Sequence, residues 1–150
     1  MGLRLGPSEP FEVTGAVIDP LDACLSAVEG VPADPGGPPM ALPTLPAVLA
    51  LADAAGGGGP ASVLRAATAG RAGVGVVHGD TRVESVRPVR VGDRLVFTST
   101  VESVRSMGGA TVLAVGTTVV AAGAGSRDAE PVASLRSTFV LTAPASVVGR

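Results

Sequence analysis

The stretch that decides the fold runs from Val76 to Leu95 and reads VVHGDTRVESVRPVRVGDRL. Its apolar and polar residues largely alternate, and a period of two predicts a β-strand. The segment Arg87–Asp93 then combines proline with a Gly-Asp pair, which predicts a tight corner leading into a second strand. The same period continues beyond it, and strands are predicted at 74–87, 93–106, 110–122 and 132–142. Strands that follow one another through short turns predict an antiparallel sheet.

Two turns in this region have a local chemical basis. The Gly108-Gly109 pair lies between two strand-like runs and predicts a tight β-hairpin. The segment 123–131 is longer and polar, and it predicts a wider turn before the last strand. The back half of the chain is therefore expected to be a meander of strands without an intervening helix.

The front half carries a different pattern. Phe11-Glu12-Val13 alternates and predicts a short strand. Residues 16–28 have helical spacing, with Thr14 as a candidate N-cap, Pro20 expected in the first turn and Gly30 as the stop signal. The fold class predicted from both halves is α+β.

A second helix is predicted at 44–55. Thr44 is its candidate cap, Pro46 lies in its first turn, and its apolar residues cover nearly the whole circumference. A helix of that kind is usually buried, so we expect the sheet to wrap around it. Residues 61–73 are compatible with a short helix or a loop, and we expect a surface connection there.

Composition bounds the function. A chain of 150 residues, 46% hydrophobic and with a net charge of −2, predicts one globular domain over residues 1–150 with a flexible N-terminus at 1–10. Without a basic run there is no electrostatic basis for nucleic-acid binding. A single Cys24 gives no disulfide framework and no cysteine metal cluster. With no long apolar run either, we predict a cytoplasmic protein that spans no membrane and needs no metal or cofactor.

Three segments carry a family resemblance. Pro43-Thr44-Leu45-Pro46-Ala47 resembles the P-P-T-F-P-A start of the central helix in MaoC-like hydratases and dehydratases, with Leu45 in place of Phe. Val77–Arg82 and Arg87–Leu95 resemble the strand and corner that follow. The resemblance covers roughly residues 40–142. It implies a hotdog domain, in which an antiparallel sheet wraps around a central apolar helix.

The resemblance extends to the branch that contains the non-catalytic subunits of heterodimeric (3R)-hydroxyacyl-ACP dehydratases. Catalytic members carry a G-D-x-N-P-x-H segment that supplies the acid and base for dehydration. The matching stretch here, residues 29–35, reads EGVPADP and contains no histidine. Pro43 also lacks the N–H that an oxyanion donor would need. The resemblance therefore implies a subunit without its own catalytic pair.

His78 is the single histidine of the chain, and three roles are open to it. It is a structural strand residue, a residue lining a substrate channel, or a substitute base oriented by Asp80. His78 and Asp80 are two residues apart and share one face if the strand is regular.

The leading interpretation is a tunnel-forming, stabilising subunit that pairs with a MaoC-like catalytic subunit in fatty-acid or polyketide biosynthesis. Its substrates would be acyl-ACP or acyl-CoA thioesters, with Thr44, Leu45 and His78 as expected substrate-binding residues. One alternative is a homodimeric hotdog hydratase or thioesterase that uses His78. Another is a stand-alone acyl-thioester binding protein.

Overall fold

The computed structural model describes residues 2–26, 43–54, 56–123 and 129–143, and the backbone alone for 21–26. The described part contains short N-terminal strands, three helices and four long strands. In chain order they are β1 (Arg4–Leu5), β2 (Phe11–Glu12), α1 (Gly15–Ser26), α2 (Leu45–Leu51), α3 (Pro60–Thr68), β3 (Gly75–Ser85), β4 (Arg94–Met107), β5 (Ala110–Ala122) and β6 (Ala129–Thr142).

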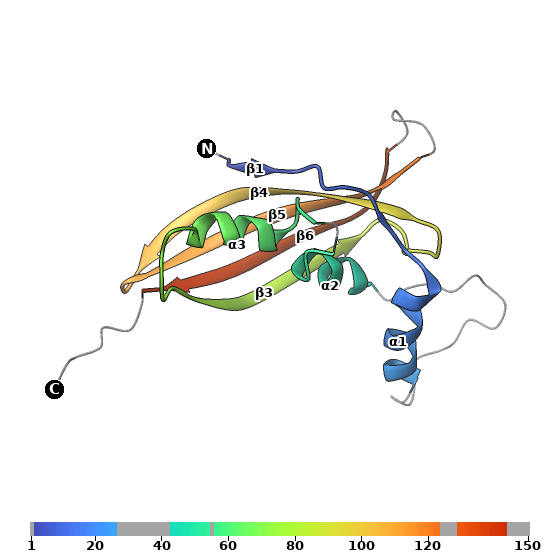
Figure 1. Ribbon diagram of the computed structural model, residues 1–150, viewed down its shortest axis with the longest axis horizontal. Helices are drawn as coiled ribbons and strands as arrows, with labels where there is room; N and C mark the ends of the chain where they lie inside the picture. Colours follow the sequence, from blue (N-terminus) through green and yellow to red (C-terminus); the bar gives the residue numbers. More distant parts are fainter. Residues whose placement is uncertain (1, 27–42, 55, 124–128, 144–150) are drawn as a thin grey trace.

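The strands form one antiparallel sheet in the order β1-β4-β5-β6-β3, with β2 also paired to β4 (Figure 1). All four predicted long strands are confirmed, with boundaries that differ by up to a few residues. The β4–β5 hairpin turns at Gly108 and Gly109, whose φ angles are 58° and 85°. Two successive positive φ angles are typical of the turn that joins twisted antiparallel strands tightly, and glycine adopts them without strain.

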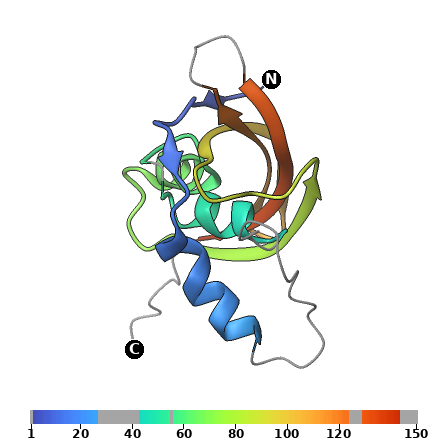
Figure 2. The ribbon, with the colours of Figure 1, turned by 90° about the vertical axis from the view of Figure 1, so that its right-hand side faces the viewer.

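The sheet curves around α2 and α3 (Figure 2), which gives it an inner face toward these helices and an outer face away from them. Every second residue of β4 from Leu95 to Val101 is buried, and these residues form the inner face of the strand. Helix α2 contributes Leu45 and four further buried residues to the core. The α+β hotdog prediction is confirmed.

The central helix is shorter than predicted. Helix α2 has seven residues, and its C-cap Ala52 is followed by Asp53 in the left-handed region at φ 54°. Helix α3 provides the remaining cover, and Val63 on it is only 1% exposed. The expectation of a surface connection at 61–73 is therefore wrong for this helix, since two short helices occupy the place expected for one long helix.

The N-terminal region also differs from expectation. Helix α1 begins at Gly15, directly after Thr14, so Pro20 lies in its interior rather than in its first turn. The predicted stop signal Gly30 lies outside the described residues. Within the N-terminus expected to be flexible, β1 pairs with β4, and Ser8 exchanges hydrogen bonds with the backbone of Phe97. These bonds use polar groups at the edge of β4 that would otherwise be unpaired.

The predicted corner between β3 and β4 is closed by an ion pair. Arg87 donates to both carboxylate oxygens of Asp93, at 2.8 and 3.1 Å, and also pairs with Glu130 of β6 at 3.0 Å. The backbone N–H of Arg90 donates to the same carboxylate at 2.8 Å. Gly92, at φ 94°, provides the left-handed residue that the turn needs. The corner therefore holds the end of β3 against β6.

Candidate functional site

His78 lies on β3, the edge strand of the sheet, where the strand is irregular. The register with β6 shifts between His78, which faces Phe139, and Asp80, which faces Thr138. Gly79 is the extra residue, and such a bulge reverses the alternation of side chains. His78 therefore points to the inner face and Asp80 to the outer face. The regular strand that a shared face requires is therefore not present here, and a dyad of the two does not form.

The imidazole of His78 is held from two sides. Its ring stacks on the buried ring of Phe139, with centroids 5.2 Å apart and an interplanar angle of 29°. Its Nε2 lies 2.7 Å from Thr81 Oγ1 and 3.1 Å from the backbone oxygen of Asp80. These contacts hold the ring in one orientation although the residue itself is exposed.

A chain of hydroxyl groups continues from His78 into the protein. Thr81 Oγ1 lies 2.8 Å from Ser137 Oγ on the neighbouring strand β6, and Ser137 is 1% exposed. Further along the inner face, Ser99 of β4 and Thr117 of β5 are also buried and hydrogen-bonded to each other at 2.7 Å. Buried hydroxyls need such partners, because an unsatisfied polar group in the core is costly.

These four hydroxyl side chains lie in two adjacent cross-strand rows. Thr81 is paired with Ser137, and Ser99 is paired with Thr117. The buried apolar residues form two clusters, one around Phe97 and α2 and the other around Phe139 and Val63. We name the four hydroxyl residues the polar band. It crosses the inner face where the two clusters meet, and His78 lies at its open end.

Thr44 and Leu45 occupy the start of α2. Thr44 is exposed at the N-cap position, but its side chain makes no capping hydrogen bond there. Leu45 is 1% exposed and belongs to the cluster around Phe97, whereas His78 stacks on a member of the other cluster. The fold thus places two of the expected substrate-binding residues at the start of α2 and the third on β3, beside a different core cluster.

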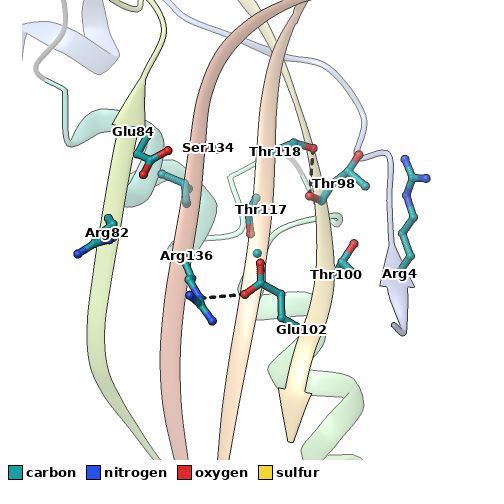
Figure 3. Close-up of a pocket in the computed structure, with 12 residues that line it drawn as sticks. Arg4, Arg82, Glu84, Thr98, Thr100, Glu102, Thr117, Thr118, Ser134 and Arg136 are labelled. Carbon is teal, nitrogen blue, oxygen red and sulfur yellow. Dashed lines mark hydrogen bonds and ion pairs between the residues drawn. The ribbon is translucent and has the colours of Figure 1, made fainter. Parts of the chain in front are cut away.

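A cavity of about 460 Å³ opens on the outer face of the sheet (Figure 3). Neither His78 nor any residue of α2 lines it. Its lining is mixed and includes charged side chains from β1, β3, β4 and β6. Arg136 pairs with Glu102 across the intervening strand β5, at 2.9 Å. Gly116 of β5 lies beneath this bridge, where a Cβ atom would collide with the Glu102 carboxylate.

The sequence alone identifies neither this cavity on the outer face nor the polar band. Arg82 and Arg136 are 54 positions apart in sequence, yet they lie directly opposite each other on β3 and β6. The alternation of polar residues along each strand predicts which residues share a face of that strand. It does not predict which residues of different strands become neighbours. Only the register of the sheet brings them together.

The architecture defines the class of protein, a hotdog-fold domain, and the three motif segments are similar to those of MaoC-like proteins. Residues 38–133, more than half of the chain, match the family described as "FAS1-like, dehydratase domain region". The chain belongs to this family.

Curated relatives are similar over a short segment. A UPF0336 protein of Streptomyces griseus is 62% identical over 34 residues, and one of Streptomyces avermitilis is 59% identical over 34 residues. Each match covers 23% of this chain and 23% of the relative, so the chain spans about a quarter of the length of the relatives it matches.

Solved structures show the same fold over nearly the whole chain. The HadBC (3R)-hydroxyacyl-ACP dehydratase complex of Mycobacterium tuberculosis has a TM-score of 0.64 at 20% identity, over 93% of this chain and 95% of that chain. A MaoC-like dehydratase of Rhodospirillum rubrum has a TM-score of 0.61 at 16% identity, over 95% and 92% of the two chains. The ChsH1–ChsH2 complex of M. tuberculosis follows at 0.55 and 16% identity, over 93% and 90%.

Helices long and apolar enough to cross a bilayer are lacking among the residues that the structure describes.

Proposed function

We propose that this chain is the non-catalytic subunit of a heterodimeric (3R)-hydroxyacyl-thioester dehydratase in cytoplasmic fatty-acid or polyketide biosynthesis. One observation carries the proposal: the chain belongs to a dehydratase family, and the stretch at 29–35 that the resemblance compares with the acid–base segment of catalytic members reads EGVPADP. This stretch lies outside the described residues, so the proposal uses its sequence alone. Dehydration needs a positioned acid and base. A partner subunit of MaoC-like type would supply both.

The geometry around His78 supports a role without chemistry of its own. A substitute base would need an orienting group, and Asp80 points to the opposite face of the sheet from His78. The contacts to His78 come instead from Thr81, Phe139 and a backbone carbonyl, and none of these is an acid. We assign His78 to substrate binding rather than to proton transfer, together with the exposed Thr44. Leu45 is 1% exposed and belongs to the core rather than to a binding surface.

The free edge of the sheet supports a partner. Within the described part of the chain, strand β3 pairs with β6 on one side only. Val76 and Val77, on opposite faces of β3, are 43% and 55% exposed. An edge strand with exposed apolar residues on both faces is a template for pairing with another chain. Two of the structurally similar proteins are complexes of different subunits, HadBC and ChsH1–ChsH2. We place the partner's sheet alongside β3.

The test is reconstitution. The chain is co-expressed with a MaoC-like protein that carries G-D-x-N-P-x-H, and dehydration of (3R)-hydroxyacyl-CoA and (3R)-hydroxyacyl-ACP is followed by enoyl absorbance. We expect background rates for the isolated chain and turnover for the complex. A complex whose partner has alanine at its motif histidine should be inactive.

Other outcomes favour other functions. Turnover by the isolated chain that is abolished by His78→Ala would replace the proposal with a homodimeric hydratase or thioesterase. Tight thioester binding with neither turnover nor a partner would favour a stand-alone acyl-thioester binding protein.

A further inference from the structure

The hydrogen bonds of His78 define which of its nitrogens carries the proton. A carbonyl oxygen can only accept, so the 3.1 Å contact between Nε2 and the backbone oxygen of Asp80 requires a proton on Nε2. The same N–H also lies 2.7 Å from Thr81 Oγ1, which leaves the Thr81 hydroxyl free to donate to Ser137. The network thus assigns the proton of neutral His78 to Nε2.

The other nitrogen then becomes the available one. In the neutral Nε2–H imidazole, Nδ1 carries a lone pair and acts only as an acceptor. Within the described part of the chain, the hydrogen bonds of this ring all involve Nε2. The stack on Phe139 restricts rotation of the ring, so the direction of the Nδ1 lone pair is set before any ligand arrives.

We infer that Nδ1 of His78 is a preorganised hydrogen-bond acceptor for an O–H or N–H group of the bound acyl thioester. The inference rests on the proposed function and deepens it, because it names the ligand group that this chain recognises. A (3R)-hydroxyacyl thioester offers two donors of this chemistry, the 3-hydroxyl group and the amide N–H groups of the pantetheine arm. A carboxylate or phosphate is not a match, since two acceptors would face each other.

The Gly79 bulge and the polar band give the arrangement its structural basis. A regular β3 would place the side chains at 78 and 80 on one face. The bulge instead puts the imidazole of His78 on the inner face and the carboxylate of Asp80 on the outer face. The polar band then holds Nε2 from behind through Thr81 and Ser137. His78 is thus a binding residue, and Thr81 and Ser137 are positioning residues that act through it.

The experiment uses the fact that His78 is the only histidine. The chain is labelled with ¹⁵N and assembled with its unlabelled partner, or with itself if it is a homodimer. Its imidazole nitrogens are then read by two-bond ¹H–¹⁵N correlation at a pH above the histidine titration. We expect the Nε2–H tautomer, and an upfield shift of the Nδ1 resonance on saturation with ligand.

Three probes distinguish the two donors: 3-hydroxydecanoyl-CoA, decanoyl-CoA and coenzyme A alone. If the Nδ1 resonance shifts with the hydroxyacyl probe and with neither of the others, the donor is the 3-hydroxyl group. A shift with all three assigns it to the pantetheine amides. A predominant Nδ1–H tautomer, or an unchanged Nδ1 resonance with all three probes, overturns the inference. These readouts do not depend on turnover, so they can fail or succeed separately from the reconstitution assay.

Variants supply the matched comparison. His78→Phe keeps an aromatic ring for the stack on Phe139 and removes both nitrogens, and we expect thioester binding to weaken about tenfold by calorimetry. Thr81→Val removes the hydroxyl behind Nε2 and should shift the imidazole resonances of the free protein. Thr118→Val, a similar change on the outer face, should alter neither quantity. Equal binding by the wild type and His78→Phe would overturn the inference.

Discussion

At the scale of single residues, Arg87 and Asp93 explain why the corner motif begins with arginine and ends with aspartate. Their side chains are only 19% and 15% exposed, and they form a two-point ion pair that also receives the backbone N–H of Arg90. Burial raises the pKa of the Asp93 carboxyl, but the hydrogen bonds from Arg87 and Arg90 and the two positive charges outweigh it and leave the pKa below its ordinary value. The hydrogen bond to Asp93 raises the pKa of Arg87 against the opposing effect of burial.

The first prediction is a pH-dependent loss of stability in Asp93→Asn. The pKa of Asp93 is lower in the folded chain than in the unfolded chain, so its contribution is complete above the unfolded pKa of about 4. We expect Asp93→Asn to lower the free energy of unfolding by about 2 kcal/mol near pH 7. The difference from wild type should shrink as the pH falls below about 4, where the unfolded chain binds the proton first, and should vanish once the folded carboxylate is protonated as well. Urea unfolding across this pH range measures it.

Asp80→Asn is the matched control for that series. Asp80 is exposed on the outer face and takes part in none of the ion pairs found among the described residues. Its replacement should change the free energy of unfolding by less than about 0.5 kcal/mol. A difference between Asp93→Asn and wild type that stays constant down to pH 2 would contradict the assigned role of the carboxylate.

At the scale of elements, the sequence pattern of 44–55 predicts a buried helix correctly but overestimates its length, because two short helices, α2 and α3, form instead. The apolar composition of 44–55 correctly indicates a buried helix, because five residues of α2 are buried. Asp53 ends it early by adopting a positive φ and binding Ser62 and Arg65 of α3 through its side chain. That interaction joins two helices that are separate in sequence, so the pattern of one segment cannot reveal it.

The second prediction compares two aspartate substitutions on α2. Leu49 is 6% exposed and lies in the core, whereas its neighbour Val48 is 46% exposed. Leu49→Asp places an unpaired carboxylate among apolar side chains and should cost about 3 kcal/mol or more. Val48→Asp should cost less than about 1 kcal/mol, and thermal melting of both variants measures the difference.

Arg65 on α3 would be a poor control for this comparison, because its side chain pairs with Asp53. Similar melting temperatures for Leu49→Asp and Val48→Asp would mean that α2 does not pack on the inner face of the sheet. The hotdog arrangement of this chain would then have to be revised.

At the scale of the whole molecule, the two edges of the sheet are unequal. On the β4 side, β1 and β2 pair with parts of the edge. On the other side, β3 has eleven residues, of which ten pair with β6 and eight are exposed, and β6 is its only neighbour among the residues that the structure describes. An uncovered edge of this length invites association.

The third prediction is that the protein forms a dimer through β3, with a non-identical subunit when one is present. Val76→Lys combined with Val77→Lys should weaken the dimer about tenfold or more, since charged residues on an edge strand oppose pairing. Val104→Lys is the control, because Val104 is 61% exposed on β4, away from this edge. Light scattering at micromolar concentration measures the association. A stable monomer in the presence of the MaoC-like subunit would contradict the prediction.

The sequence by itself determined the local features of this protein. The period of two predicts the long strands, Gly108-Gly109 predicts the hairpin, and the segment from Arg87 to Asp93 predicts the corner. Each of these depends on the preferences of neighbouring residues, namely side-chain alternation and the backbone freedom of glycine. The sequence EGVPADP at 29–35, which contains no histidine, can likewise be read without a structure.

Only the tertiary structure decided which side chains meet. The bulge at Gly79 separates His78 from Asp80, and its position is defined by the register against β6. The polar band combines one hydroxyl residue from each of four strands, and the corner gains Glu130 from the far end of the sheet. Register is a long-range property, because it depends on how all the strands bury their apolar faces together. The sequence pattern of any one strand therefore cannot specify it.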